Sequence, residues 1–188
     1  MSGGAYIALS GLRLRAAQLD RVAADIANAG TSGYKAERSS SRPAERPAFQ
    51  SALDSAIDVA EGPTRIDFRP GAVTPTGRDL DFAIDGRGFF VIDTPAGPRY
   101  TRGGSFAKNA DSVLVAADGS PVAGENGAIR IGEGQVTADP DGTIRVGGAP
   151  AGRLRVVEFD DPAGLEREDA GRFRAPDTVA PRAGSSAV

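Results

Sequence analysis

The chain has 188 residues and carries 22 Lys and Arg against 25 Asp and Glu, so its net charge of −3 lacks the basic surplus that nucleic-acid-binding proteins use. Histidine and cysteine are both absent, which excludes disulfides, thiol nucleophiles, the common zinc sites and acid–base catalysis by histidine. No apolar run of about eighteen residues is present for membrane insertion, and the N-terminus lacks the charged and apolar regions of a cleaved secretory signal.

Residues 3–29 carry the clearest periodic pattern and predict an amphipathic helix. Apolar residues recur there at alternating spacings of 4 and 3, which is the a/d seam of a heptad repeat. This helix stripe consists of Ala5, Leu9, Leu12, Ala16, Leu19, Ala23 and Ile26. The same spacing suits a helix that rests on its own domain, but no second helix of this kind follows in the chain. We therefore expect residues 1–36 to form an assembly segment whose helix stripe binds other subunits.

The helix is expected to end within ANAGTSGYK, residues 27–35, because Gly30 and Gly33 permit the left-handed backbone that closes helices. Residues 37–63 are expected to form a linker. Its first part is charged and rich in Ser and Pro, as flexible connections are, and a weak helical segment covers residues 49–59.

From residue 64 to residue 160 the apolar pattern changes to a period of two, which predicts a β-rich domain. The expected strands cover residues 80–85, 89–93, 99–101, 105–108, 113–116, 128–131, 135–138, 143–146 and 154–159. Turn-forming pairs such as Asp118-Gly119 and Asp141-Gly142 separate them. Many short strands at close spacing indicate an antiparallel sandwich or partly open barrel.

Residues 89–92 are apolar on both faces, so this strand is expected to be covered on both sides, by the core or by a neighbouring molecule. Residues 161–188 contain scattered Gly and Pro and are expected to form an irregular tail. The fold class is therefore α+β, mainly β, with an N-terminal heptad helix, a linker and an antiparallel β-rich domain.

Three acidic residues near the first expected strand, Asp79, Asp81 and Asp85, are candidates for carboxylate catalysis of the glycosidase kind. Alternation places Asp81 and Asp85 on the solvent face of that strand, opposite its apolar residues. A general acid needs a shielded pocket that raises its pKa, and nothing in the sequence builds one. We therefore predict no catalytic residue.

Two segments have the composition of ligand loops but are better interpreted as turns. Gly86-Arg87-Gly88 lacks the third glycine of a phosphate-binding fingerprint, and an apolar strand follows it in place of a helix. Residues 139–143 begin like a calcium loop, but the further oxygen ligands and the terminal Glu are missing. We predict a turn at each place, with no metal site and no cofactor.

Several spaced motifs resemble those of the bacterial flagellar rod, hook and hook-associated proteins. The first motif, similar to the family signature ANxxTPGYK, consists of Ala27, Asn28, Thr31, Gly33, Tyr34 and Lys35. The second motif consists of Leu80, Asp81, Ala83, Ile84, Gly86, Gly88, Phe89 and Phe90. Residues 100–106, 114–115 and 119–122 continue the pattern, and the order of the motifs makes the resemblance more specific than any one of them. Within the family the sequence resembles most the proximal rod type (FlgF), with a distal rod or hook-family subunit as the alternative.

The resemblance implies a structural subunit of the flagellar basal-body rod and no enzyme. Members of the family have a helical domain that forms the inner tube and a β-rich domain outside it. They are exported by the flagellar type III apparatus without a cleaved signal, and they self-assemble in the periplasm into the rod that transmits motor torque to the hook. The implied partners are other copies of the chain, neighbouring rod proteins and the export apparatus, with no nucleic acid and no membrane insertion.

An alternative from another class is a β-sandwich module that binds an envelope polymer, which would need an aromatic-lined groove.

Two departures from the family pattern also stand out. Ser32 occupies the place where the family usually has Pro, which loosens the turn without forbidding it. The family also pairs its N-terminal helix with a C-terminal helix preceded by a motif of the form LExSNVN, and the sequence ends at Val188 without either. Either the sequence is truncated or other subunits complete the helix packing.

Overall fold

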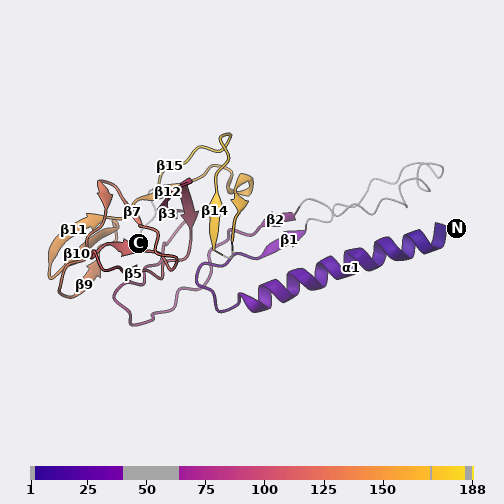
Figure 1. Cartoon of the computed structure of the whole chain (residues 1–188), viewed down its shortest axis with the longest axis horizontal. Coiled ribbons are helices and arrows are strands. Elements are labelled where there is room, and N and C mark those ends of the chain that lie inside the picture. Colours follow the sequence, from indigo (N-terminus) through magenta and orange to yellow (C-terminus); the bar gives the residue numbers. More distant parts are fainter. Residues whose placement is uncertain (1–2, 40–63, 170, 185–187) are drawn as a thin grey trace. The chain divides into compact units, whose positions relative to one another are not determined.

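The computed structural model describes residues 3–39, 64–169, 171–184 and 188, and Figure 1 shows their helices and strands. The chain divides into two compact units. The helical unit contains Met1–Gly30 and Lys35–Asp67, and the β-rich unit contains Thr31–Tyr34 and Phe68–Val188. Most of the expected linker, residues 40–63, lies outside the described residues, and so does the weak helical segment expected over residues 49–59.

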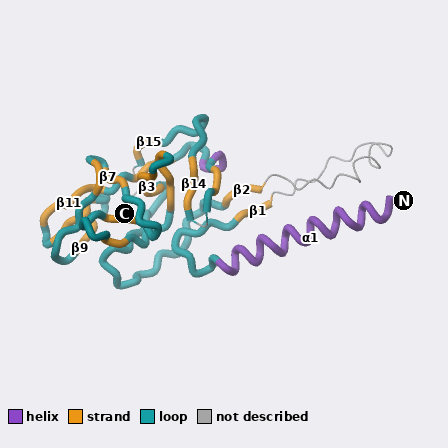
Figure 2. Tube along the Cα trace, viewed as in Figure 1, coloured by secondary structure: helices purple, strands orange, loops and turns teal. Residues whose placement is uncertain are grey.

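One long helix, α1 (Gly3–Ala27), opens the chain and confirms the helix predicted over residues 3–29 (Figure 2). Its first turn has no acidic residue and its last turn has no basic one, so charges at the two ends do not stabilise the helix dipole. Asn28 follows the helix, and both its backbone N–H and its side-chain amide donate to the carbonyl of Ala24, at 3.0 and 2.8 Å. Among the described residues, no helix has the length and apolar character needed to cross a membrane.

A two-stranded antiparallel sheet completes the described part of the helical unit. It pairs β1 (Glu37–Ser39) with β2 (Thr64–Ile66). The N–H of Asp67 extends the pairing by donating to the carbonyl of Ala36 at 2.9 Å. Residues 37–39 were predicted to belong to a linker, and this part of the prediction is wrong. The partner strand lies far along the chain, so the local sequence around residue 37 gives no sign of it.

The β-rich unit is built on a six-stranded sheet in the order β13-β14-β4-β3-β12-β15. Its strands are β3 (Phe89–Thr94), β4 (Gly97–Thr101), β12 (Val156–Glu158), β13 (Glu166–Arg167), β14 (Arg172–Arg174) and β15 (Arg182–Ala183). A 3-10 helix, η1 (Pro162–Gly164), lies between β12 and β13. β3 and β4 form a hairpin in which Thr94 lies opposite Gly97, with the turn at residues 95–96.

Smaller sheets complete this unit: a three-stranded sheet in the order β11-β10-β9 and the two-stranded pairs β5-β6 and β7-β8. Their strands are β5 (Ala107–Lys108), β6 (Leu114–Val115), β7 (Ala123–Gly124), β8 (Gly127–Ala128), β9 (Val136–Ala138), β10 (Thr143–Val146) and β11 (Ala149–Arg153). Each of these pairings is antiparallel. Short strands joined by loops therefore dominate the unit (Figure 2), which confirms the mainly β fold class.

Residues 80–85 do not form the predicted strand. Asp81 makes only an isolated antiparallel bridge to Ser105. Two further hydrogen bonds flank it, from the N–H of Phe82 to the carbonyl of Gly104 at 2.9 Å and from the N–H of Phe106 to the carbonyl of Leu80 at 3.1 Å. The alternation of apolar residues still gives this segment an inner side, because Leu80, Phe82 and Ile84 pack against the apolar cluster.

The expected irregular tail needs a correction, because it supplies strands to the central sheet. β14 pairs with β4, with Phe173 opposite Tyr100, and β15 pairs with β12. Phe173 is completely buried. These strands have two or three residues each. A segment this short shows no period of two, so only its distant partners reveal it.

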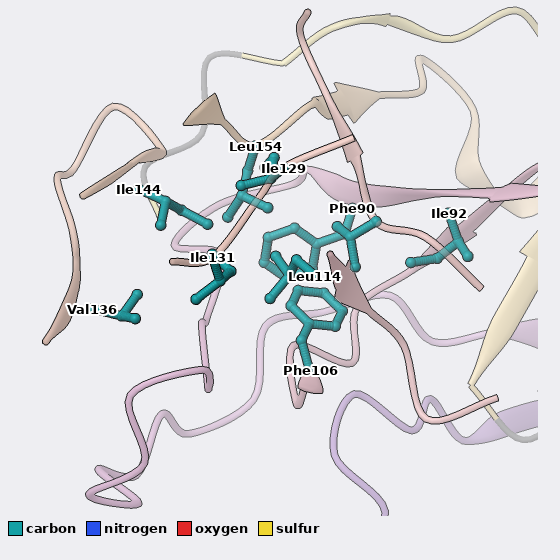
Figure 3. Close-up of a cluster of buried hydrophobic side chains, with 10 residues drawn as sticks. Phe90, Ile92, Phe106, Leu114, Ile129, Ile131, Val136, Ile144 and Leu154 are labelled. Atoms are coloured by element: carbon teal, nitrogen blue, oxygen red, sulfur yellow. The ribbon is translucent and has the colours of Figure 1, made fainter. Parts of the chain in front are cut away.

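β3 separates two groups of buried side chains. On one side, Phe90 and Ile92 belong to the apolar cluster of Figure 3, where the rings of Phe90 and Phe106 meet edge to face at 5.2 Å. On the other side, the ring of Phe89 meets those of Phe68 and Phe159 at 5.4 and 5.6 Å. The prediction that this strand is covered on both faces is confirmed, and the cover comes from the chain itself.

The turn predicted at residues 139–143 is confirmed, whereas Gly86-Arg87-Gly88 forms a bend. Gly86 has a φ of +135°, and the chain enters β3 two residues after Arg87. Gly142 has a φ of +83°, in the turn that joins the antiparallel strands β9 and β10. The carboxylate of Asp141 there accepts hydrogen bonds from the N–H and the hydroxyl of Thr143, both at 3.0 Å. These contacts stabilise a hairpin through its own side chains.

Candidate assembly surfaces

The helix stripe lies on the exposed surface of α1. Leu12 and Leu19 are 66% and 69% exposed, and Leu9 and Ile26 are exposed as well. The small members Ala16 and Ala23 are also exposed, and Ala5 belongs to the same helix. Because an α-helix has 3.6 residues per turn, positions 3 and 4 apart share one side of it. In the part of the chain that the structure describes, the stripe is thus an exposed apolar edge.

Val22 is a further exposed apolar residue of α1. The heptad spacing left it out, but Val22 and Ile26 are four residues apart and lie one above the other on the helix surface. A search for exposed apolar side chains at any helical spacing would have found it. Burying one Leu or Val side chain contributes roughly 1.5–3 kcal/mol, so a partner that covers this edge would gain several times that amount.

The first motif begins at the end of α1 and continues into a tight loop. Ala27 is the last helical residue and Asn28 binds the preceding turn. In the loop, the N–H of Tyr34 donates to the carbonyl of Thr31 at 3.2 Å, and Gly33 has a φ of +74°. Non-glycine residues rarely adopt that backbone conformation, so the turn requires the glycine.

The first and second motifs contact the same pair of glycines, Gly103 and Gly104. A Cβ atom placed on Gly103 would lie 2.9 Å from the carbonyl oxygen of Ser32, and one placed on Gly104 would lie 2.8 Å from the carbonyl carbon of Phe82. Both distances are shorter than real Cβ contacts allow, so each glycine is needed for a close approach of two backbones. The sequence analysis treated the two motifs separately and did not predict that they meet here.

Tyr34 packs under an arginine from the C-terminal part of the chain. The guanidinium carbon of Arg167 lies 5.0 Å from the centre of the Tyr34 ring and 5.7 Å from the centre of the Phe173 ring. Such cation–π contacts stabilise by about 0.5–1 kcal/mol where exposed and by more where water is excluded. One arginine therefore joins the first motif to strand β14.

Asp81 of the second motif is held by its neighbours as an ionised carboxylate. Nε of Arg78 donates to it at 3.0 Å and the hydroxyl of Thr76 donates to it at 2.7 Å. Arg78 also donates to the hydroxyl of Ser105. The hydrogen bond from Arg78, followed by that from Thr76, lowers the pKa of Asp81. A general acid needs the opposite shift, so this arrangement holds a loop in place and does not prepare a proton donor.

The remaining residues of the second motif shape the start of β3. Leu80 and Ile84 pack against the apolar cluster, whereas Ala83 is exposed. Gly88, Phe89 and Phe90 are buried. Arg102 donates to the carbonyl of Gly86 at 2.7 Å, and its guanidinium carbon lies 5.1 Å from the centre of the Phe89 ring. Burial lowers the pKa of this arginine.

A groove of about 480 Å³ lies beside the first motif in the β-rich unit. Thr31, Ser32 and Ser105 line one part of it, and Asp118, Asp169 and Arg172 line another. Its lining includes a single aromatic residue, Phe106. Stacking against a sugar ring needs an exposed aromatic face, and Phe106 is buried. The groove is therefore a poor fit for an envelope polymer.

The charged residues of the groove satisfy one another. Arg172 forms ion pairs with Asp169, at 2.6 Å, and with Asp118. Burial alone would raise the pKa of Asp118, but hydrogen bonds from Ser120 and Arg172 outweigh it and the pKa is lowered. Burial would likewise raise the pKa of Asp169, but hydrogen bonds from Arg172 and from the N–H of Gly171 outweigh it, and this pKa is lowered as well. Both carboxylates thus stay ionised and paired.

Asp79 and Asp85, the other two acidic candidates, are exposed. Among the described residues, no group of three or more acidic side chains is placed to hold a metal ion. The described surfaces thus consist of an exposed apolar edge on the helix and of ion pairs and close backbone contacts in the β-rich unit.

Comparison with known proteins identifies the group to which these features belong. The family of the flagellar hook protein FlgE/F/G D1 domain matches residues 83–146, which include most of the second motif and strands β3 to β10. The flagellar basal-body rod protein FlgF of Caulobacter vibrioides is 33% identical over 97% of this chain and 76% of its own length. FlgF of Rhizobium meliloti is 33% identical over 90% of the chain and 70% of its own length.

A second type of rod protein is similar as well. The flagellar basal-body rod protein FlgG of Bacillus subtilis is 30% identical over 90% of the chain and 72% of its own length. The resemblance to the rod and hook proteins seen in the two motifs is thereby confirmed across nearly the whole sequence. The chain belongs to the family of flagellar basal-body rod proteins of the FlgF type, which are structural subunits of the rod.

Proposed function

We propose that this chain takes its place in the rod through α1, whose helix stripe packs against helices of other subunits. The observation that carries the proposal is the exposure of Leu12 and Leu19, at 66% and 69%, in a single copy of the chain. Large apolar side chains repeated along one helix edge are costly in water and are stabilised when a second helix covers them. Residues 1–36 are then the assembly segment.

The partners in this proposal are other copies of the chain and neighbouring rod and hook proteins. The similarity to FlgF, FlgG and FlgE proteins supports this choice, since all of them are flagellar rod or hook subunits by name. The site of assembly is the basal body in the periplasm, reached through the flagellar type III apparatus without a cleaved signal. The subunit would transmit motor torque as part of the drive shaft and would perform no catalysis. A distal position in the rod is the alternative, supported by the FlgG relative.

The test replaces two large residues of the helix stripe with charged ones, Leu12→Asp together with Leu19→Asp. The control introduces the same two aspartates at positions of α1 outside the stripe, Gln18→Asp together with Ala24→Asp. Incorporation is measured in basal bodies purified from cells that make only the variant chain, together with swimming in soft agar.

We expect the stripe variant to be missing from purified basal bodies and the control variant to be incorporated. Both should keep the thermal unfolding midpoint of the β-rich unit, because that unit has its own core. Normal incorporation of the stripe variant would refute the proposal.

A further inference from the structure

The path of the chain between the two units is unusual. Thr31–Tyr34 belongs to the β-rich unit, while the residues on both sides of it, Met1–Gly30 and Lys35–Asp67, belong to the helical unit. The chain therefore leaves α1, touches the β-rich unit with four residues, departs again and returns at Phe68. A short peptide that belongs to a unit without being continuous with it must be held there by its own contacts.

The first of these contacts is the close approach of Gly33 to Gly103. A Cβ atom on Gly33 would lie 2.5 Å from the Cα atom of Gly103, and a Cβ atom on Gly103 would lie 2.9 Å from the carbonyl oxygen of Ser32. The atoms that would collide are backbone atoms, which cannot rotate aside as a flexible side chain does. The two glycines thus allow a contact that no other residue pair would allow.

The second contact is aromatic and is centred on Phe173, which links the residues where the chain leaves and rejoins the β-rich unit. Arg167 lies over the rings of Tyr34 and Phe173. Phe68, the residue at which the chain returns, meets Phe173 edge to face at 5.1 Å. Phe173 is completely buried, and it contacts both Phe68 and the arginine that stacks on Tyr34. The chain's departure after Tyr34 and its return at Phe68 are therefore held around one residue of β14.

We infer that Thr31–Tyr34 is an anchoring peptide that fixes the end of the assembly helix to the β-rich unit, with the Gly33–Gly103 contact and the Arg167 stack as its two holding points. The inference rests on the proposed function, because an assembled helix needs a firm connection to the rest of its subunit. It adds a positioning role for Gly33, Gly103 and Arg167, none of which lies on the helix stripe.

The anchor shortens the free connection between the helix and the β-rich unit. With the anchor in place, only residues 28–30 separate α1 from that unit. Without it, the next residue of the chain to belong to the β-rich unit would be Phe68. The anchor therefore shortens the free chain between α1 and that unit.

The experiment substitutes Gly33→Ala in the full chain and compares it with two matched glycine variants. Gly77→Ala has the same backbone requirement, with a φ of +72°, but nothing lies within 4 Å of an added Cβ atom. Gly30→Ala lies in the same loop region and also has open space around it. The first control isolates the effect of the left-handed backbone, and the second isolates the effect of altering this loop.

Amide hydrogen exchange of peptides covering residues 31–36 is the first measurement. We expect exchange about tenfold or more faster in Gly33→Ala than in either control, because the added methyl group releases the anchor while the core stays folded. Peptides covering β3 and β10 should exchange at the wild-type rate. Equal exchange of residues 31–36 in Gly33→Ala and Gly77→Ala would overturn the inference.

The second measurement is a distance distribution between labels on the two units. The chain has no cysteine, so Asp20→Cys and Asp177→Cys provide a unique labelled pair. We expect the distribution to broaden in Gly33→Ala and in Gly103→Ala and to stay unchanged in Gly77→Ala. The double variant should be no broader than either single variant, because each change already releases the same contact. Additive broadening would overturn the inference, because it would show that the two glycines do not form one contact.

These readouts use the unassembled protein, so they separate the anchor from assembly. The stripe variant Leu12→Asp with Leu19→Asp should leave the exchange of residues 31–36 unchanged. If that variant still enters basal bodies, the proposed assembly role of the stripe fails while the anchor stands. If Gly33→Ala behaves like its controls, the anchor fails while the assembly role stands.

Discussion

β3 and α1 both carry a series of large apolar side chains, but among the described residues only those of β3 are buried. Phe89, Phe90, Val91 and Ile92 are at most 2% exposed, since the apolar cluster lies on one face of the strand and an aromatic group on the other. Leu12 and Leu19 of α1 remain open to solvent. The difference separates a strand whose apolar side chains are buried within one copy of the chain from a helix edge that we propose is covered by another subunit.

The largest effect is expected from a cavity beside β3. Phe90→Ala removes a completely buried ring that meets Phe106, and such substitutions destabilise by about 3–5 kcal/mol. Leu12→Ala removes an apolar side chain from the exposed helix edge, and its effect on the unassembled chain should stay within about 0.5 kcal/mol. Urea unfolding followed by circular dichroism measures both. Similar losses for the two variants would remove the distinction between β3 and α1.

The next largest loss of stability is expected from Gly104, whose backbone lies close to that of Phe82 in the second motif segment. Gly104→Ala places a methyl group against the backbone of Phe82 and close to the ring of Phe90. Overpacking of this kind costs about 1–3 kcal/mol. Gly119→Ala is the comparison, because Gly119 has open space but a φ of +83°. Thermal unfolding should show a lower midpoint for Gly104→Ala than for Gly119→Ala, and the reverse order would contradict the close contact.

A smaller effect is expected from the ion pairs of the groove. Arg172→Ala removes the partner of both Asp118 and Asp169. Each pair is partly exposed to solvent, where ion pairs contribute about 0.2–1 kcal/mol. The loss should shrink when the urea unfolding is repeated in high salt, which screens exposed charges. A loss that does not respond to salt would indicate packing of the arginine stem as its cause.

Acid should weaken the β-rich unit gradually. The pKa values of Asp81, Asp118, Asp141 and Asp169 are lowered below the ordinary 3.8, in each case with hydrogen bonds to the carboxylate favouring its ionised form. Their stabilisation is therefore fully present above about pH 4 and is lost as the pH falls through the folded-state values. Thermal midpoints measured against pH should fall below about pH 4. They should be nearly flat from about pH 5 to 8, because the chain has no histidine.

The sequence predicts those parts of the molecule whose pattern is local. The 4 and 3 spacing around Leu12 and Leu19 predicted α1, and the apolar run from Phe89 predicted a strand with two covered faces. Asp141-Gly142 predicted a hairpin from its own turn chemistry. In each case the residues that reveal the structure are neighbours in the chain, so periodicity and turn preference are enough.

What the sequence could not predict depends on distant partners. β14 is recognisable only because Phe173 lies opposite Tyr100 in the folded sheet. Residues 37–39 become a strand only because residues 64–66 lie beside them. The meeting of the two motifs at Gly103 and Gly104 is of the same kind, since a glycine in a sequence does not reveal which backbone approaches it. The exposure of Val22 was missed for a simpler reason, because a strict heptad spacing excludes it.

The position of β14 beside β4 has a consequence for the order in which the protein folds. β4 lies between β3, which precedes it directly, and β14, which follows more than sixty residues after the hairpin closes. Contacts between residues so far apart in sequence form slowly, because a long loop must close first. The stack of Arg167 on the rings of Tyr34 and Phe173 is complete only when β14 has paired with β4. Tyr34 would thus gain its full set of contacts late in folding, although it lies near the start of the chain.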